Sequence, residues 1–118
     1  MEILIEEIKF PIIIHHSPEG PTREYRIEQL NEILEAFGEK LNKRSPVQRI
    51  ELTIEDPKNP LGKIVAYGAK LHVLFYSGKS YIASSDSFVA KAQHLGLETN
   101  VREAGKEILK QIESDEER

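Results

Sequence analysis

The spacing of apolar residues changes near residue 45, and this change narrows the choice of fold class more than any other feature of the sequence. Before it, apolar residues recur at intervals of three and four, which predicts an amphipathic helix over residues 22–43. After it, apolar and polar residues alternate from 47 to 55, which is typical of a strand with one buried face. A chain with both patterns packs a helix stripe on a sheet face, so we expect the α+β class.

Further segments predict three more strands. The Ile-rich stretch within residues 1–16 predicts an opening strand. Pro11 inside it favours a sheet edge, a bulge or a break, because proline has no N–H to donate to a neighbouring strand. Residues 47–84 predict a meander of three strands, and Ser77-Gly78 is its last turn.

The last third of the chain predicts a second helix. Residues 86–98 form a connection that could hold a short helix ending at Gly96. A helix is predicted over 100–113, with Asn100 in capping-box position at its start. The acidic residues 114–118 are expected to form a frayed, solvated tail.

The predicted element order is therefore β-α-β-β-β-α. A length of 118 residues suits one domain, which we expect to cover residues 1–118. Successive strands with short links favour a mostly antiparallel sheet, and two amphipathic helices can cover one of its faces. We expect a two-layer α+β sandwich.

Composition excludes several classes of protein. The chain has no cysteine, which rules out disulfides, thiolate zinc sites, iron–sulfur clusters and cysteine nucleophiles. Its longest apolar stretch, residues 10–14, is far shorter than the roughly 20 residues that a membrane-spanning helix needs. Acidic residues follow Met1 where a secretory signal would be basic. We expect a soluble, cytoplasmic protein without a membrane partner.

Motifs for catalysis or metal binding are weak. Gly78-Lys79-Ser80 resembles the end of a phosphate-binding loop, but Val73 stands in place of the first glycine, so a hairpin turn is favoured. The serines around Asp86 lack a G-x-S-x-G elbow, and Asp86 is better explained as a helix cap. Metal-ligand spacing is absent among the four histidines, His15, His16, His72 and His94. We expect no enzyme, no metal and no cofactor.

A basic run at the end of the first helix is the main candidate for a binding surface. Between residues 40 and 49 the chain has four basic residues and no acid: Lys40, Lys43, Arg44 and Arg49. Three of them also complement the negative end of the helix dipole, which accounts for them without a ligand. Lys70, His72 and Tyr76 share the polar face of the long strand that is predicted after the strand at 47–55. Phosphate contacts and base stacking are therefore available beside the basic run.

Two parts of the chain resemble a known family. Residues 47–55 (VQRIELTIE) and 69–79 (AKLHVLFYSGK) are similar to the second and third strands of the ribosome-hibernation factors, also described as ribosome-associated inhibitors and sigma-factor modulation proteins. Residues 100–112 (NVREAGKEILKQI) are similar to the last helix of that family. The predicted order of elements resembles the family's order as well.

The resemblance implies a protein without catalytic activity that binds the small ribosomal subunit near the decoding and tRNA sites and silences translation under stress. It implies that the basic contacts fall at Lys40, Lys43, Arg44, Arg49, Lys70, Lys79, Lys91, Arg102 and Lys106. His72 and Tyr76, from the polar strand face, complete the predicted RNA-binding site.

Two alternatives remain open. From Ile27 onward the order helix, three strands, helix also resembles a double-stranded RNA-binding domain, and residues 102–106 (REAGK) are similar to the basic motif of its last helix. The other alternative is a protein-interaction or oligomerisation module. In it, the Ile-rich first strand and the apolar Leu74 and Tyr76 pair with a second copy through strand addition, giving a homodimer.

Overall fold

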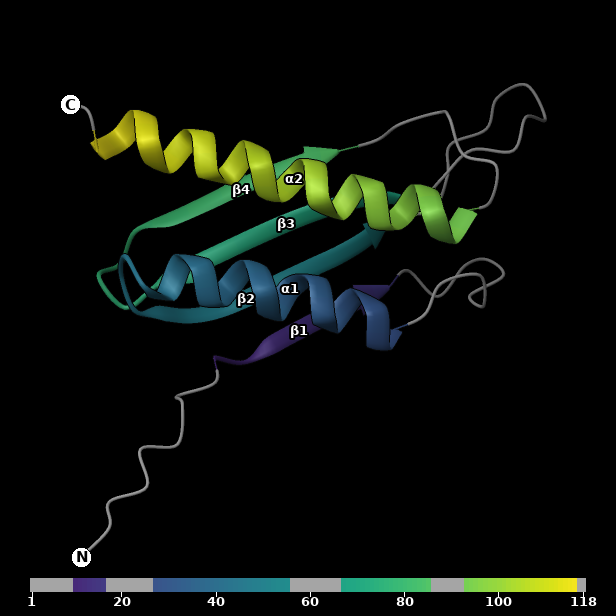
Figure 1. The fold of residues 1–118 in the computed structure, drawn as a ribbon, viewed down its shortest axis with the longest axis horizontal. Coiled ribbons are helices and arrows are strands. Elements are labelled where there is room, and N and C mark those ends of the chain that lie inside the picture. Colours follow the sequence, from purple (N-terminus) through teal and green to yellow (C-terminus); the bar gives the residue numbers. More distant parts are fainter. Residues whose placement is uncertain (1–9, 17–26, 56–66, 86–92, 117–118) are drawn as a thin grey trace, which may run out of the picture.

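The computed structural model describes residues 10–16, 27–55, 67–85 and 93–116 (Figure 1). Four strands and two helices occur in these ranges, in the predicted order β-α-β-β-β-α. Their bounds are β1 Ile12–His16, α1 Ile27–Asn42, β2 Val47–Glu55, β3 Gly68–Phe75, β4 Ser80–Ser85 and α2 Gln93–Glu116. The expected α+β class is confirmed.

The four strands form one mixed sheet in the order β1-β2-β3-β4. β2, β3 and β4 are an antiparallel meander, whereas β1 runs parallel to β2, with α1 between them in the chain. Both helices lie on one side of the sheet (Figure 1). β1 is an edge strand, which confirms the edge position that Pro11 favoured, and Pro11 contributes its carbonyl oxygen as acceptor for the Ile50 N–H at 3.0 Å.

The core lies between the sheet and the two helices. Alternate residues of β2 and β3 point into it, as their polar–apolar alternation predicted, while the apolar stripes of both helices pack from above. The fully buried residues of this layer are Leu30, Leu34, Leu41, Ile50, Leu52, Ile54, Leu71, Val73, Leu97, Ala104 and Ile108.

A β-bulge interrupts the register at the start of β2. Val47 pairs with Phe75 while Arg49 pairs with Leu74, so Gln48 is an extra residue on β2. Val47 and Ile50 are both buried as a result, although three positions separate them. The bulge keeps Arg49 on the face of the sheet that the helices do not cover.

α2 differs most from expectation. The predicted helix end at Gly96 is wrong, because α2 runs without a break from Gln93 and Gly96 is buried inside it. Asn100 is not a cap: it is fully buried, and its Nδ2 donates to the Tyr67 carbonyl oxygen at 2.8 Å. The Ser85 hydroxyl donates to Asn100 Oδ1 at 3.2 Å, so tertiary partners satisfy an amide that sequence alone placed at a helix end.

The C-terminal end of α2 also differs from the prediction. Residues 114–116, predicted to fray, are helical, and the Asp115 carboxylate is held by β4. The predicted opening of the first strand at 1–9, the predicted helix cap Thr22, and Asp86 and Lys91 lie outside the described residues. Neither described helix is long and apolar enough to cross a membrane.

Candidate nucleic-acid interface

The face of the sheet opposite the helices is the first place to look for a ligand surface. Neither α1 nor α2 lies on it, because both pack on the other side (Figure 1). Strand register arranges its side chains in rows across the strands. One row is Ile13, Glu51, His72 and Ile82, and the next is His15, Thr53, Lys70 and Ser84. We call this surface the open sheet face.

Three predicted site residues lie on the open sheet face, and a fourth follows just beyond the end of β3. Lys70 and His72 project from β3 at every second position, about 7 Å apart along the strand, and Tyr76 follows just beyond its end. Arg49 stands next to them on β2, opposite Leu74. Tyr76 is 65% exposed, which leaves its ring available to a partner. The structure thus brings two cationic side chains and an imidazole onto one surface, and an exposed aromatic ring follows just beyond the end of β3.

Glu51 moderates the charge of this surface. Its Oε1 lies 3.2 Å from Arg49 Nε, and its Oε2 lies 3.8 Å from His72 Nδ1. The second contact is an ion pair only when the imidazole is protonated. Lys70 is exposed and has no ion pair within the described ranges. Lys70 is therefore the cation of this face that is free to meet a phosphate, and Arg49 must exchange Glu51 for it.

The basic run from residue 40 to 49 does not form a single patch. Arg44 points towards the end of α2, with guanidinium nitrogens 4.0 Å from Glu113 and 3.9 Å from Glu116. Lys43 is exposed next to the end of α1. Arg49 lies on the open sheet face, and Lys40 lies on the helix side. Tertiary structure has separated residues that are neighbours in sequence.

The helix side of the domain collects three more of the predicted residues. Lys40 from α1 and Arg102 and Lys106 from α2 line the same groove between the two helices. Lys106 Nζ lies 3.2 Å from Glu103 Oε1 one turn away. This groove and the open sheet face are on opposite sides of the sheet, so one flat ligand cannot contact both groups.

The hairpin end of the sheet carries a polar network that sequence analysis missed. The Tyr81 hydroxyl donates to Asp115 Oδ2 at 2.7 Å, and Lys79 Nζ lies 3.2 Å from the same oxygen. The pKa of Tyr81 is raised to about 12, mainly because Asp115 accepts the phenol proton in this hydrogen bond. Burial and the negative charges of Asp115 and Glu116 raise the pKa in the same direction. Lys79 is thereby neutralised and serves the fold. Little in the sequence indicated this network, because Asp115 belongs to the segment that was predicted to be a frayed tail.

The Gly78-Lys79-Ser80 segment is a hairpin turn. The Phe75 N–H donates to the Lys79 carbonyl at 2.9 Å and the Gly78 N–H to the Phe75 carbonyl at 3.0 Å. Gly78 has a φ of 92°, a conformation that a side chain would strain. The segment links two strands and no helix follows it, so the predicted hairpin is confirmed at this position.

Metal ligands do not gather in the described residues, where no group of three His, Asp or Glu side chains could hold an ion. Comparison with protein-family models gives no match, and comparison with curated protein sequences gives none either. The surfaces of the described residues are therefore the basis for proposing a function.

Proposed function

We propose that this protein is a non-catalytic RNA-binding domain that contacts RNA through the open sheet face. One observation carries the proposal: Arg49, Lys70 and His72 occupy a surface that neither described helix covers, and the exposed ring of Tyr76 follows just beyond the end of β3. RNA is bound by this combination of groups elsewhere, with cations on phosphates and an aromatic ring on an unstacked base.

The sheet gives these groups fixed positions. Lys70 and His72 belong to β3, which hydrogen-bonds to a strand on each side, so their spacing cannot drift when a ligand arrives. Arg49 is set beside them by the bulge at Gln48. In the complex, a phosphate replaces Glu51 as the partner of the Arg49 guanidinium, whose fork geometry suits phosphate oxygens.

The RNA we propose as target is that of the small ribosomal subunit. The support is the sequence resemblance to ribosome-hibernation factors together with the β-α-β-β-β-α order, which is the order that resemblance implied. In this proposal the protein occupies the subunit under stress and so inhibits translation. The activity requires binding alone, with no reacting group.

Co-sedimentation with small ribosomal subunits tests the proposal. The protein should enter the subunit fraction at low salt and leave it as salt is raised, because each phosphate contact releases counterions. Lys70→Glu should weaken co-sedimentation, whereas Lys110→Glu, at an exposed lysine on α2 with the same charge change, should leave it intact. Free protein at every salt concentration, or equal behaviour of the two variants, would contradict the proposal.

A second candidate is self-association through the same face. Ile13, Tyr76 and Ile82 are exposed large apolar residues; Ile13 and Ile82 lie on the open sheet face, and Tyr76 follows the end of β3. Strand addition at the β4 edge is obstructed, because Gln111 Nε2 donates to the Ile82 carbonyl at 3.1 Å. A dimer that persists at high salt and dissociates in Ile82→Lys would favour this function over RNA binding.

A further inference from the structure

A groove of about 500 Å³ runs between α1 and α2 on the helix side of the domain. Its floor is apolar and consists of Ile33, Leu34, Phe37, Leu71, Val101 and Leu109. Ile33, Phe37 and Leu109 are only partly buried, so the two helices leave apolar surface between them uncovered within the described part of the chain.

Small residues produce this groove. Ala36 on α1 and Gly105 on α2 both line it, and neither fills the space between the helices. Phe37 lies against Gly105 so closely that a Cβ there would be 3.3 Å from its ring. The Phe37 ring thus packs on α2 at Gly105, and the groove stays open beside it.

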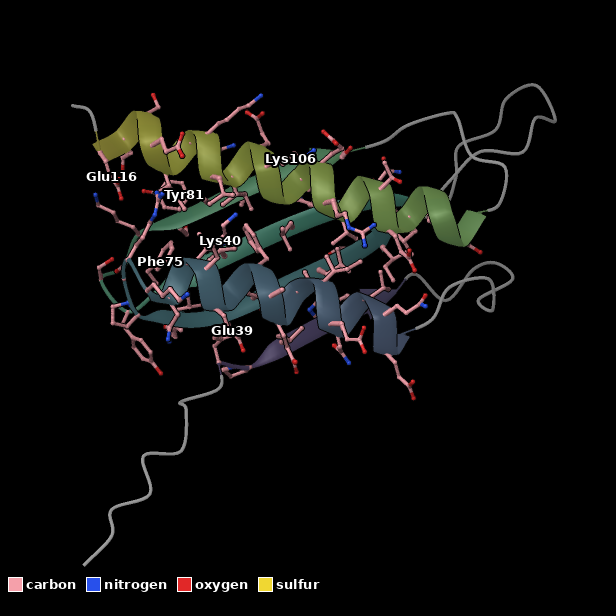
Figure 2. All side chains as sticks on the ribbon, in the orientation of Figure 1. Glu39, Lys40, Phe75, Tyr81, Lys106 and Glu116 are labelled. Atoms are coloured by element: carbon pink, nitrogen blue, oxygen red, sulfur yellow. The ribbon has the colours of Figure 1, made fainter. Side chains whose placement is uncertain are left out.

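The groove is positive although its surroundings are negative. Lys40, Arg102 and Lys106 line it, against one acid, Glu32. Figure 2 shows Lys40 on α1 and Lys106 on α2. Lys106 has Glu103 as a partner, while Lys40 and Arg102 form no ion pair within the described ranges. Outside the groove, the exposed charged side chains of both helices are mainly acidic, among them Glu28, Glu35, Glu39 and Glu107.

We infer that this groove binds an acidic amphipathic helix of a protein partner. Apolar side chains of that helix would enter the floor, and its carboxylates would meet Lys40 on one wall and Arg102 and Lys106 on the other. The wall from Glu32 to Lys40 is about 12 Å long at 1.5 Å per residue, enough for about two turns of the ligand helix.

The charge pattern favours a peptide over RNA at this groove. A nucleic acid would leave the apolar floor without a partner. An acidic amphipathic helix satisfies both features, because its apolar side covers the floor and its carboxylates meet a wall with three cations and one acid. The inference is independent of the RNA-binding function, which uses the opposite side of the sheet.

Fluorescence anisotropy with a labelled synthetic peptide tests the inference. The probe is an amphipathic helix with Leu at helical spacing and Glu elsewhere, and the control probe has Lys in place of Glu. The full-length protein should bind the Glu peptide saturably and the Lys peptide at least about tenfold more weakly. Lys40→Glu/Lys106→Glu should lose about tenfold or more in affinity. Lys43→Glu/Lys110→Glu, with the same charge change beside the groove, should bind as the unsubstituted protein does.

A second variant tests the apolar floor without changing charge. Ala36→Trp fills the groove and should weaken the Glu peptide, while circular dichroism checks that the helices persist. The inference is overturned by an unsubstituted protein that shows no saturable binding, by equal affinities of the two double variants, or by equal binding of both peptides. It is also overturned if an RNA oligonucleotide displaces the peptide, since RNA would then be the occupant.

Discussion

The open sheet face and the inter-helix groove both present basic side chains, yet they are built for different partners. On the sheet, Lys70 and His72 have Thr53, Glu51, Ser84 and Ile82 as cross-strand neighbours, and the strands keep them in line. Between the helices, Lys40 and Lys106 flank an apolar floor (Figure 2). The number of cations on a surface therefore does not identify its ligand. The side chains next to the cations decide which ligand fits.

We expect the largest effect from reversing two charges on the open sheet face. Arg49→Glu/Lys70→Glu should weaken binding to small ribosomal subunits about 100-fold at low salt, because two phosphate contacts become repulsive. The salt dependence of the remaining binding should be shallower. Sedimentation across a salt series measures both quantities. The same double variant should bind the acidic peptide unchanged, and a loss of peptide affinity there would show that the two surfaces are not independent.

Substitution of two glycines compares how tightly the helices pack on the sheet side and at the groove. In Gly38→Ala a new Cβ would overlap the ring of Phe10 and lie 2.8 Å from Ile50 Cδ1, so we expect a loss of about 1–2 kcal/mol in unfolding free energy. In Gly105→Ala the Phe37 ring can move into the groove, and the helix propensity of alanine offsets the contact. Urea unfolding measures both, and equal losses would contradict the difference in packing.

Tyr76 tests whether the open sheet face stacks on bases. Tyr76→Ala should weaken RNA binding about tenfold, since stacking on an aromatic ring contributes about 1–3 kcal/mol per base. Tyr76→Phe keeps the ring and should bind as before. Unlike the charge reversal, neither change should alter the dependence of binding on salt. If Tyr76→Ala instead dissociates a dimer, self-association through this face becomes the better explanation.

The Tyr81–Asp115 hydrogen bond is expected to contribute least. Tyr81→Phe should lower the unfolding free energy by about 1 kcal/mol, since the pair is only partly buried. The pKa of Tyr81 is raised above its ordinary value of 10 to about 12, so this stabilisation is fully present below pH 10 and is lost as the pH rises through 12. The difference in stability between the native protein and Tyr81→Phe should shrink over that range in urea unfolding. A difference that stays constant would argue against this pair.

All four residues of the proposed sheet site were among the site residues predicted from the sequence. Alternation along β3 placed Lys70, His72 and Tyr76 on one face, because successive side chains of a strand point to opposite sides. The basic run near residue 40 was misleading as a site, since its members are divided between the end of α1, the helix groove and the sheet. Ion pairs such as Arg44 with Glu113 join residues far apart in the chain, and no local pattern reports them.

By itself the sequence determined what depends on neighbours in the chain: the order of helices and strands, the buried side of each, and the hairpin at Gly78. Tertiary structure alone decided the parallel pairing of β1 with β2, the continuation of α2 through Gly96, and the burial of Asn100 against the Tyr67 carbonyl. The physical reason is the range of the interactions. Periodicity and turn conformation are local, whereas strand pairing and the satisfaction of a buried amide need groups brought together only by the fold.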